Sequence, residues 1–273
     1  MSDTPDTKAY LQALLDTEPL RSPLLHEVIA ALELPAGSRG LDAGCGFGRQ
    51  ALMLAEAIGP DGHVTGLDIE PEFIRYATRE AEEAGYSERV SFSQGDAHSP
   101  PFAADTFDWV WSADCLGYPA GELRPVLREL SRIVKPGGTV ALLAWSSQNL
   151  LPGYQLLEAR LNAFSSSYVP PLTGPHPELH FPRALHWFRE AGLTNASART
   201  FLGQVQGPLT EEIRAGLASI FDQLWGKALA GEDKADRQEF ERLCRPGSAD
   251  FILDLPDYHA YFTYTLFRGT VAV

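Results

Sequence analysis

Between residues 38 and 145, short apolar segments alternate with amphipathic ones, and this order restricts the chain to few folds. Segments such as HVTGLDI (63–69) and FDWVWS (107–112) are rich in β-branched and aromatic residues and predict strands. The segment 122–134 has aligned leucines at helical spacing and predicts a helix. Strands that alternate with helices through short connections form a parallel sheet with helices on both faces. We therefore expect an α/β fold whose ligands bind beyond the carboxyl ends of the strands.

The flanking segments lack this regular alternation and predict helical additions to the sheet. Two helices are expected before residue 36, with Pro23 beginning the second. A long aromatic segment, 257–273, predicts a further strand near the end of the chain. We expect three regions: an N-terminal helical cover (1–36), a ligand-binding core (37–145), and the rest of the sheet with helical lid insertions (146–273, insertions at about 146–181 and 207–250).

Charge and cysteine content narrow the classes of function. Lys and Arg total 22 against 36 Asp and Glu, a formal net charge of −14, and no run of basic residues is present. Such a chain repels phosphate backbones, so nucleic acid is an unlikely partner. No apolar run is long enough to span a bilayer, and the first residues do not have the pattern of a secretory signal. The three cysteines are widely spaced and predict neither disulfides nor a zinc site, so a cytoplasmic location is expected.

The stretch SRGLDAGCGFGR (38–49) places three alternating glycines directly after the first expected strand. The dinucleotide-binding pattern GxGxxG would need a third glycine at position 49, which is Arg49. The pattern present is D-x-G-x-G-x-G, from Asp42 to Gly48. Glycines allow a ligand to approach the main chain closely, and free N–H groups at the start of the following helix favour a carboxylate.

Four motifs in order make the chain resemble the class I S-adenosylmethionine-dependent methyltransferases of small-molecule type, related to ubiquinone and menaquinone methyltransferases. They are LDAGCGFGR, GLDIEP, GDA, and FDWVWSADCLGY followed by LSRIVKPGG. The resemblance implies a Rossmann-like, doubly wound, seven-stranded and mostly parallel sheet, with an antiparallel C-terminal strand and helical lid insertions. It also implies S-adenosyl-L-methionine as cofactor and S-adenosyl-L-homocysteine as product, and residues 37–145 then form the cofactor-binding core.

The motifs carry the expected cofactor contacts, which come from the ends of four strands. The resemblance implies that Asp42 faces the methionine moiety, that Asp96 and the Ala97 main chain bind adenine, and that the backbone after the fourth strand holds the amino group. Asp68, at the end of the second strand, can accept two hydrogen bonds from ribose hydroxyls. The expected cofactor-binding residues are Asp42, Ala43, Gly44, Cys45, Gly46, Asp68, Ile69, Asp96, Ala97, Ser112 and Ala113.

Each of the three aspartates also has a purely structural interpretation. Asp42 could cap a buried turn, Asp68 could cap the helix that begins at Pro71, and Asp96 could belong to a turn. The sequence assigns no catalytic residue and no metal ligand. The candidates for a general base are His98, His176, His180 and His186, and Tyr118 is the other candidate for lining the mouth of the site.

The expected reaction is the transfer of a methyl group to a small organic acceptor, at an O, N or C nucleophile, by in-line displacement. Two alternatives stay open: a methyltransferase acting on RNA or protein, and a non-catalytic partner subunit with the same fold. The tetrapeptide SADC (112–115) stands where an NPPY-like motif would indicate amide or base-amine targets. Methyl transfer needs a base only if the acceptor must lose a proton. A monomer or a homodimer is expected.

Overall fold

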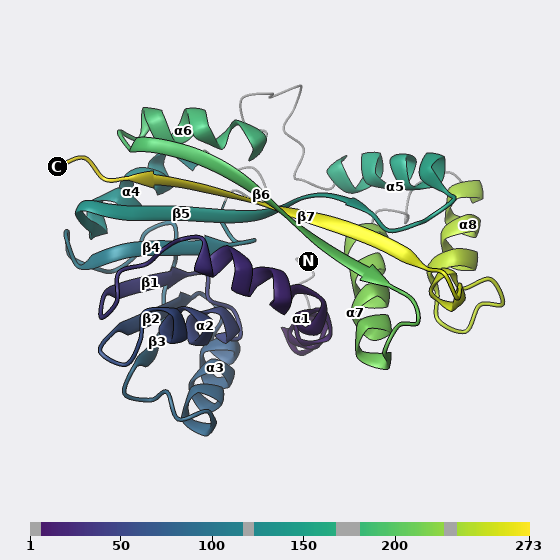
Figure 1. Cartoon of the computed structure of the whole chain (residues 1–273), viewed down its shortest axis with the longest axis horizontal. Helices are drawn as coiled ribbons and strands as arrows, with labels where there is room; N and C mark the ends of the chain where they lie inside the picture. Colours follow the sequence, from purple (N-terminus) through teal and green to yellow (C-terminus); the bar gives the residue numbers. More distant parts are fainter. Residues whose placement is uncertain (1–6, 117–122, 168–180, 227–233) are drawn as a thin grey trace, which may run out of the picture. The chain divides into compact units, whose positions relative to one another are not determined.

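Seven strands form one sheet in the order β3-β2-β1-β4-β5-β7-β6. The computed structural model describes residues 7–116, 123–167, 181–226 and 234–273 (Figure 1). The strands are β1 (Arg39–Ala43), β2 (His63–Asp68), β3 (Val90–Gln94), β4 (Phe107–Ala113), β5 (Val134–Asn149), β6 (Thr194–Gln206) and β7 (His259–Thr270). The pairs β1–β2, β1–β4, β2–β3 and β4–β5 are parallel. The strand order reverses at β1, which places the first glycine-rich turn at the switch point.

The last strand, β7, runs antiparallel to both of its neighbours. The Gly137 N–H donates to the Val271 carbonyl at 2.9 Å, and the Val271 N–H donates to the Gly138 carbonyl at 2.9 Å. Along the other side, the hydroxyls of Thr200 and Thr265 lie 3.1 Å apart. The predicted Rossmann-like, mostly parallel seven-stranded sheet with an antiparallel C-terminal strand is thus confirmed.

The helices that connect the parallel strands present one apolar face each. In α3, Phe73, Ala77 and Ala81 recur every four residues and are buried. The apolar face of α4 is buried in the same way, from Leu123 to Ile133. The helices are α1 (Thr7–Ala30), α2 (Arg49–Ala57), α3 (Pro71–Glu83), α4 (Leu123–Ile133), α5 (Gln155–Ser167), α6 (Ala184–Glu190), α7 (Glu211–Phe221) and α8 (Lys234–Cys244). No helix in the described part of the chain is both long and apolar enough to cross a membrane.

The strand β4 lies inside the sheet and is apolar along nearly its whole length, as expected for a strand covered on both faces. Its two tryptophans are fully buried, and each indole N–H has an acceptor. Trp109 donates to Ser38 Oγ and Trp111 donates to Gln50 Oε1, both at 2.8 Å. These bonds connect β4 to the start of β1 and to α2. They also satisfy two buried donors, which would destabilise the fold if they had no partner.

The chain divides into two compact units, which are described separately. We call residues Leu25–Trp145, His176–Phe201 and Tyr264–Val273 the sheet unit, and residues Met1–Leu24, Ser146–Pro175 and Leu202–Thr263 the helical unit. The helical unit collects its segments from two of the three predicted regions, the N-terminal cover (1–36) and the last region (146–273), and takes none from 37–145. That three-part division remains a prediction.

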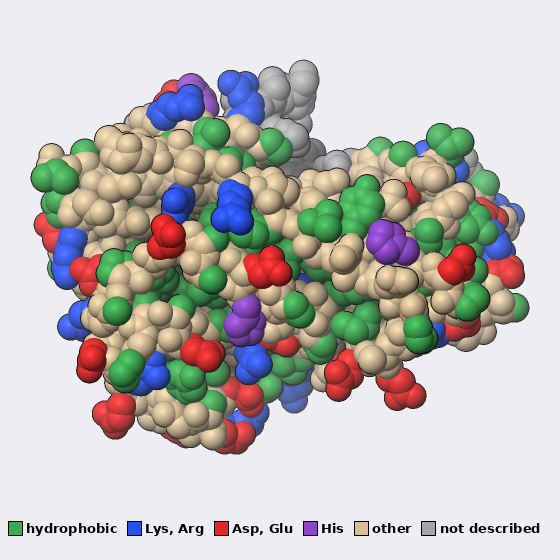
Figure 2. Space-filling view, viewed as in Figure 1, with side chains coloured by type: hydrophobic (Ala, Val, Ile, Leu, Met, Phe, Trp, Pro, Cys, Tyr) green, Lys and Arg blue, Asp and Glu red, His purple; other side chains and the backbone are tan. Residues whose placement is uncertain are grey.

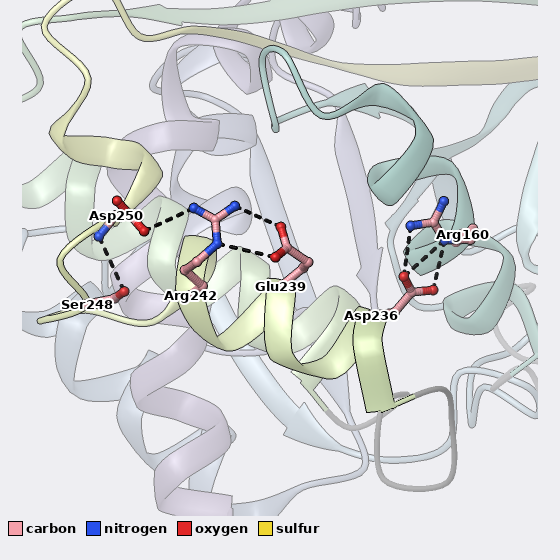
Figure 3. Close-up of polar contacts among 6 residues, drawn as sticks. All are labelled: Arg160, Asp236, Glu239, Arg242, Ser248 and Asp250. Carbon is pink, nitrogen blue, oxygen red and sulfur yellow. Dashed lines mark hydrogen bonds and ion pairs between the residues drawn. The ribbon is translucent and has the colours of Figure 1, made fainter.

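Within the helical unit, buried aromatic and charged contacts hold α5, α7 and α8 together. Trp225 is fully buried and stacks on Phe221, with ring centroids 5.7 Å apart. Arg160 of α5 binds both carboxylate oxygens of Asp236 of α8 (Figure 3). Arg242, also on α8, contacts Glu239 and Asp250.

Two local predictions differ from the structure. The expected break at Pro23 is absent, and α1 runs through both Pro19 and Pro23. A proline removes one backbone donor from a helix interior. Burial of the α1 side chains Leu24, Leu25 and Val28 offsets that loss.

The proline and glycines of the segment KPGG (135–138) are typical of a turn, but the segment lies within β5. It forms a bulge, because Phe107 pairs with Val134 whereas Trp109 pairs with Thr139. Lys135 reaches Asp108 at 2.8 Å across this bulge. The strand therefore begins earlier than its apolar pattern indicates.

Candidate cofactor site

The glycine-rich turn leaves β1 and folds back over the end of β2. The N–H groups of Gly44 and Cys45 both donate to the Leu67 carbonyl, at 2.8 and 3.0 Å. Gly44 has φ +79°, and a Cβ at this position would lie 2.1 Å from Cys115 Sγ. Only glycine fits both the conformation and the space. Gly46 also has positive φ, +52°, but faces open space.

Asp68 fixes this turn to the start of α3. The Gly46 N–H donates to Asp68 Oδ2 at 2.8 Å, and the Glu70 N–H donates to Oδ1 at 3.0 Å. The second contact fits the structural interpretation, since Glu70 is the N-cap residue of α3. A carboxylate offers about four acceptor positions, so both oxygens retain capacity for further donors such as ribose hydroxyls. The structural and the cofactor-binding interpretations are therefore compatible.

Asp42 is a buried carboxylate without a basic partner. Its exposed fraction is 2%, and its Oδ2 atom has no hydrogen-bond partner among the described residues. Burial, together with the charge of Asp68, raises the pKa of Asp42 to about 8. Buried polar atoms normally have partners, so an unsatisfied oxygen at the end of a central strand indicates a missing donor or cation.

Ser112, at the end of β4, presents a second unsatisfied oxygen. It is 2% exposed, and its Oγ has no hydrogen-bond partner among the described residues. β4 pairs with β1 up to Trp111 and Asp42, so both unsatisfied groups belong to the carboxyl ends of neighbouring strands. Ala43 and Ala113 end these two strands and are buried.

The predicted adenine-binding residues follow β2 and β3. Ile69 is 60% exposed, so its surface is open to a planar ligand. Asp96 Oδ1 accepts from the His98 main-chain N–H at 2.8 Å and lies 3.0 Å from His98 Nδ1. The main-chain bond from His98 lowers the pKa of Asp96, which keeps it ionised at neutral pH. Ala97 beside it is buried.

The site is rich in acidic groups, and the Asp42 carboxyl, whose pKa is about 8, adds a negative charge when it loses its proton. Within the described residues, neither Asp42 nor Asp68 forms an ion pair, and Asp96 pairs only with His98. S-adenosylmethionine carries a sulfonium and an ammonium against one carboxylate, so its net charge is positive. The glycine turn, the unsatisfied oxygens of Asp42 and Ser112, and this negative charge fit that cofactor.

The two thiols of the site are not activated nucleophiles. Cys45 and Cys115 are free, and Cys115 packs against Gly44. Burial raises the pKa of Cys45 well above its ordinary value, and burial together with the charge of Asp68 raises that of Cys115 to about 12. Both therefore stay protonated at neutral pH and serve packing.

Asp114 follows β4 directly and has a structural role that the sequence analysis did not predict. Asp114, with φ +50°, accepts from the Trp145 N–H at 2.9 Å and from the Tyr264 hydroxyl at 2.7 Å. It is a structural tie between β4, β5 and β7, and its position directly after a strand gave no sign of this. Of the candidate bases, His98 and His186 are exposed and contact Asp96 and Glu190. Tyr118, His176 and His180 lie outside the described residues.

Comparisons with known proteins agree with this geometry. Residues 41–138 match the model of a methyltransferase domain. A demethylmenaquinone methyltransferase of Bacillus velezensis is 31% identical over 185 residues, which cover 64% of this chain and 78% of that protein. One from Listeria welshimeri is 34% identical over 148 residues, 54% of this chain, and the match spans only 60% of the relative's length.

A solved structure, the YcgJ protein of Bacillus subtilis, shares the fold. It superposes with a TM-score of 0.58 and 22% identity, over 92% of this chain and 99% of that protein. The strand order, the glycine-rich turn and the similarity to these relatives together identify the family. The chain belongs to the class I methyltransferase family, whose cofactor is S-adenosylmethionine.

Proposed function

We propose that the protein transfers a methyl group from S-adenosylmethionine to a small organic acceptor at an O, N or C nucleophile. The observation that carries the proposal is the buried, unsatisfied Asp42 carboxylate beside the glycine turn that Asp68 holds. A non-catalytic subunit would not need to keep a carboxylate at this energetic cost. The relatives named as demethylmenaquinone methyltransferases support an acceptor of small-molecule class.

Each predicted residue has a distinct part in holding the cofactor. Asp68 accepts from the ribose hydroxyls while its Gly46 contact keeps the turn closed. Asp42 and Ser112 supply acceptors for the positively charged amino-acid end, and Cys45 and Gly46 offer main-chain groups for its carboxylate. Ile69, Asp96 and Ala97 bind adenine. When bound, the cofactor supplies a methyl group activated by its sulfonium sulfur.

The chain's contribution to the chemistry is positioning and exclusion of water. Well-oriented reactants can gain about 7–11 kcal/mol from positioning alone. A protein base is needed only for an acceptor that must lose a proton. Two observations count against RNA as acceptor: the net charge of −14 and the absence of basic runs.

Two measurements test the proposal. Calorimetry with S-adenosylhomocysteine should show one binding site per chain. Labelled cofactor, incubated with separate pools of small molecules, RNA and protein, should transfer its methyl group to the small-molecule pool. Label found in RNA or protein would show that the acceptor is a macromolecule and not a small molecule. Failure to bind S-adenosylhomocysteine would contradict the proposal that the protein is a methyltransferase.

A further inference from the structure

A pocket of about 370 Å³ lies on the sheet unit at α4 and α6, on residues that the cofactor site does not use. It is lined by Arg124, Pro125, Arg128 and Glu190. The two arginines stand one helical turn apart on α4, so their side chains project from the same face. Figure 2 shows Lys or Arg, Asp or Glu, and His side chains gathered on the surface over α6.

Glu190 contacts both Arg124 of α4 and His186 of α6. Arg124 Nη1 lies 3.3 Å from Glu190 Oε2, and His186 Nε2 lies 3.4 Å from Glu190 Oε1. The side chains of Arg124 and Glu190 are 39% and 36% exposed, so water and solutes reach both. Arg128 is exposed and has no ion-pair partner among the described residues.

The surrounding helices carry the opposite charge to the rest of the chain. The whole sequence has 36 acidic against 22 basic residues. Along α4 and α6 and the turn before α6, arginines outnumber the acidic residues: Arg124, Arg128, Arg132, Arg183 and Arg189 against Glu129 and Glu190. The pocket lining itself has two arginines against one glutamate, so it is net basic on an acidic chain.

We propose that this pocket, which we call the α4–α6 pocket, binds a compact dianion of phosphate-monoester class. Two guanidinium groups on one helix face provide paired N–H donors whose planar geometry matches phosphate oxygens. The size of the hollow suits a small group rather than an extended acidic chain. Glu190 competes with the ligand for Arg124 and so lowers its affinity. The proposal is independent of the cofactor site, which uses none of these residues.

The test is a titration with inorganic phosphate and, separately, with glycerol 3-phosphate, at constant ionic strength. Calorimetry gives the affinity, and backbone amide shifts in NMR spectra give the location. We expect saturable binding with shifts on α4 and α6, and roughly a tenfold loss of affinity for Arg128→Gln. Glu190→Gln should bind several-fold more tightly, because it removes the competing carboxylate. Tighter binding of glycerol 3-phosphate than of phosphate would identify an organic phosphate as the ligand.

The matched control is Arg189→Gln, which removes the same charge from an exposed position next to Glu190 but outside the pocket lining. It should change the affinity less than about threefold, as expected for a screened surface charge. Equal losses for Arg128→Gln and Arg189→Gln would overturn the proposal, since the effect would then be one of net charge. Absence of saturation, shifts confined to the glycine turn, or weaker binding by Glu190→Gln would overturn it as well.

Discussion

Carboxylates gather in two regions of this molecule, and they are paired with arginines in one region but not in the other. In the helical unit, Asp236 is 6% exposed and receives three hydrogen bonds from Arg160, and Glu239 and Asp250 share Arg242 (Figure 3). In the cofactor site, Asp42 is equally buried but has no cation among the described residues.

The difference indicates that Asp236 stabilises the fold, whereas we propose that Asp42 binds a ligand. A buried charge must be paired, must neutralise itself by a shift of its pKa, or must be compensated when a ligand arrives. Arg160 pairs Asp236, whereas the pKa of Asp42 rises to about 8. Substitutions in the first region should therefore lower stability and leave binding unchanged, whereas substitutions in the second should weaken binding without lowering stability.

Asp68→Ala should give the largest effect on the binding side of this comparison. It removes the acceptor for the ribose hydroxyls and for the Gly46 N–H. Each hydrogen bond to a charged group is worth about 1.5–3 kcal/mol, so affinity for S-adenosylhomocysteine should fall at least about 100-fold. Calorimetry measures this loss. Asp68→Asn, which keeps one acceptor oxygen, should lose less, and unchanged affinity in Asp68→Ala would exclude the ribose contact.

Asp42→Asn should separate binding from stability most clearly, because the two should change in opposite directions. The pKa of Asp42 is about 8 in the folded chain and near the ordinary value of 3.8 when the chain is unfolded. The folded chain therefore holds an extra proton between these values, and its stability should fall as pH rises from about 4 to about 8. The asparagine variant lacks this loss, so its Tm without ligand should exceed that of the wild type by at least about 4 °C at pH 8.

The same substitution should weaken cofactor binding, by roughly tenfold, because the positive charge of S-adenosylmethionine favours the ionised carboxylate. Binding to the wild type at pH 7 should release a proton, which calorimetry in buffers of different ionisation enthalpy detects. The asparagine variant should release none from this position. A wild-type Tm that rises between pH 5 and pH 8 relative to Asp42→Asn would contradict the assigned protonation.

Arg160→Gln tests the paired region. It leaves Asp236 buried without its cation, and loss of one partner of a buried pair is destabilising. The Arg160 side chain is itself 52% exposed, so screening reduces the cost, and we expect a loss of about 1–3 kcal/mol in the free energy of unfolding. Urea unfolding measures it. The double variant with Asp236→Asn should recover part of the loss, and affinity for S-adenosylhomocysteine should stay within about twofold of wild type.

The sheet could be predicted from the sequence because its signals are local and repeated. Each strand from β1 to β4 has its own apolar pattern, and each following helix its own apolar face. The start of β5 could not be predicted, because Lys135 and Gly137 are placed by Asp108 and Val271, which are distant in sequence. The continuation of α1 through Pro23 likewise depends on burial that no local signal reports.

In the candidate site, too, the features set by local sequence could be predicted, and those set by contacts between distant segments could not. The glycine turn and Asp68 could be found because their spacing is a fixed local motif, and the structure adds that Asp68 holds the turn through Gly46. The need for glycine at position 44 comes from Cys115, a contact between two strand ends that no spacing rule contains. The structural role of Asp114 could not be predicted, because its partners, Trp145 and Tyr264, are distant in sequence and belong to β5 and β7.

Arg242→Gln should produce the smallest change in stability, and it tests how much an exposed ion pair contributes in the helical unit. Arg242 has three partners: Glu239, Asp250 and the ring of Tyr154, whose centroid lies 5.7 Å from its guanidinium carbon. Arg242 lowers the pKa of Glu239, but the side chains of Glu239 and Asp250 are 44% and 58% exposed, against 6% for Asp236. Exposed pairs are screened by salt, so the loss in unfolding free energy should be smaller than for Arg160→Gln.

The loss for Arg242→Gln should also nearly vanish at about 1 M salt, where the Debye length is about 3 Å, whereas the Arg160→Gln loss should persist. Equal losses for both variants at that salt concentration would show that the burial of the carboxylate does not decide the strength of these pairs.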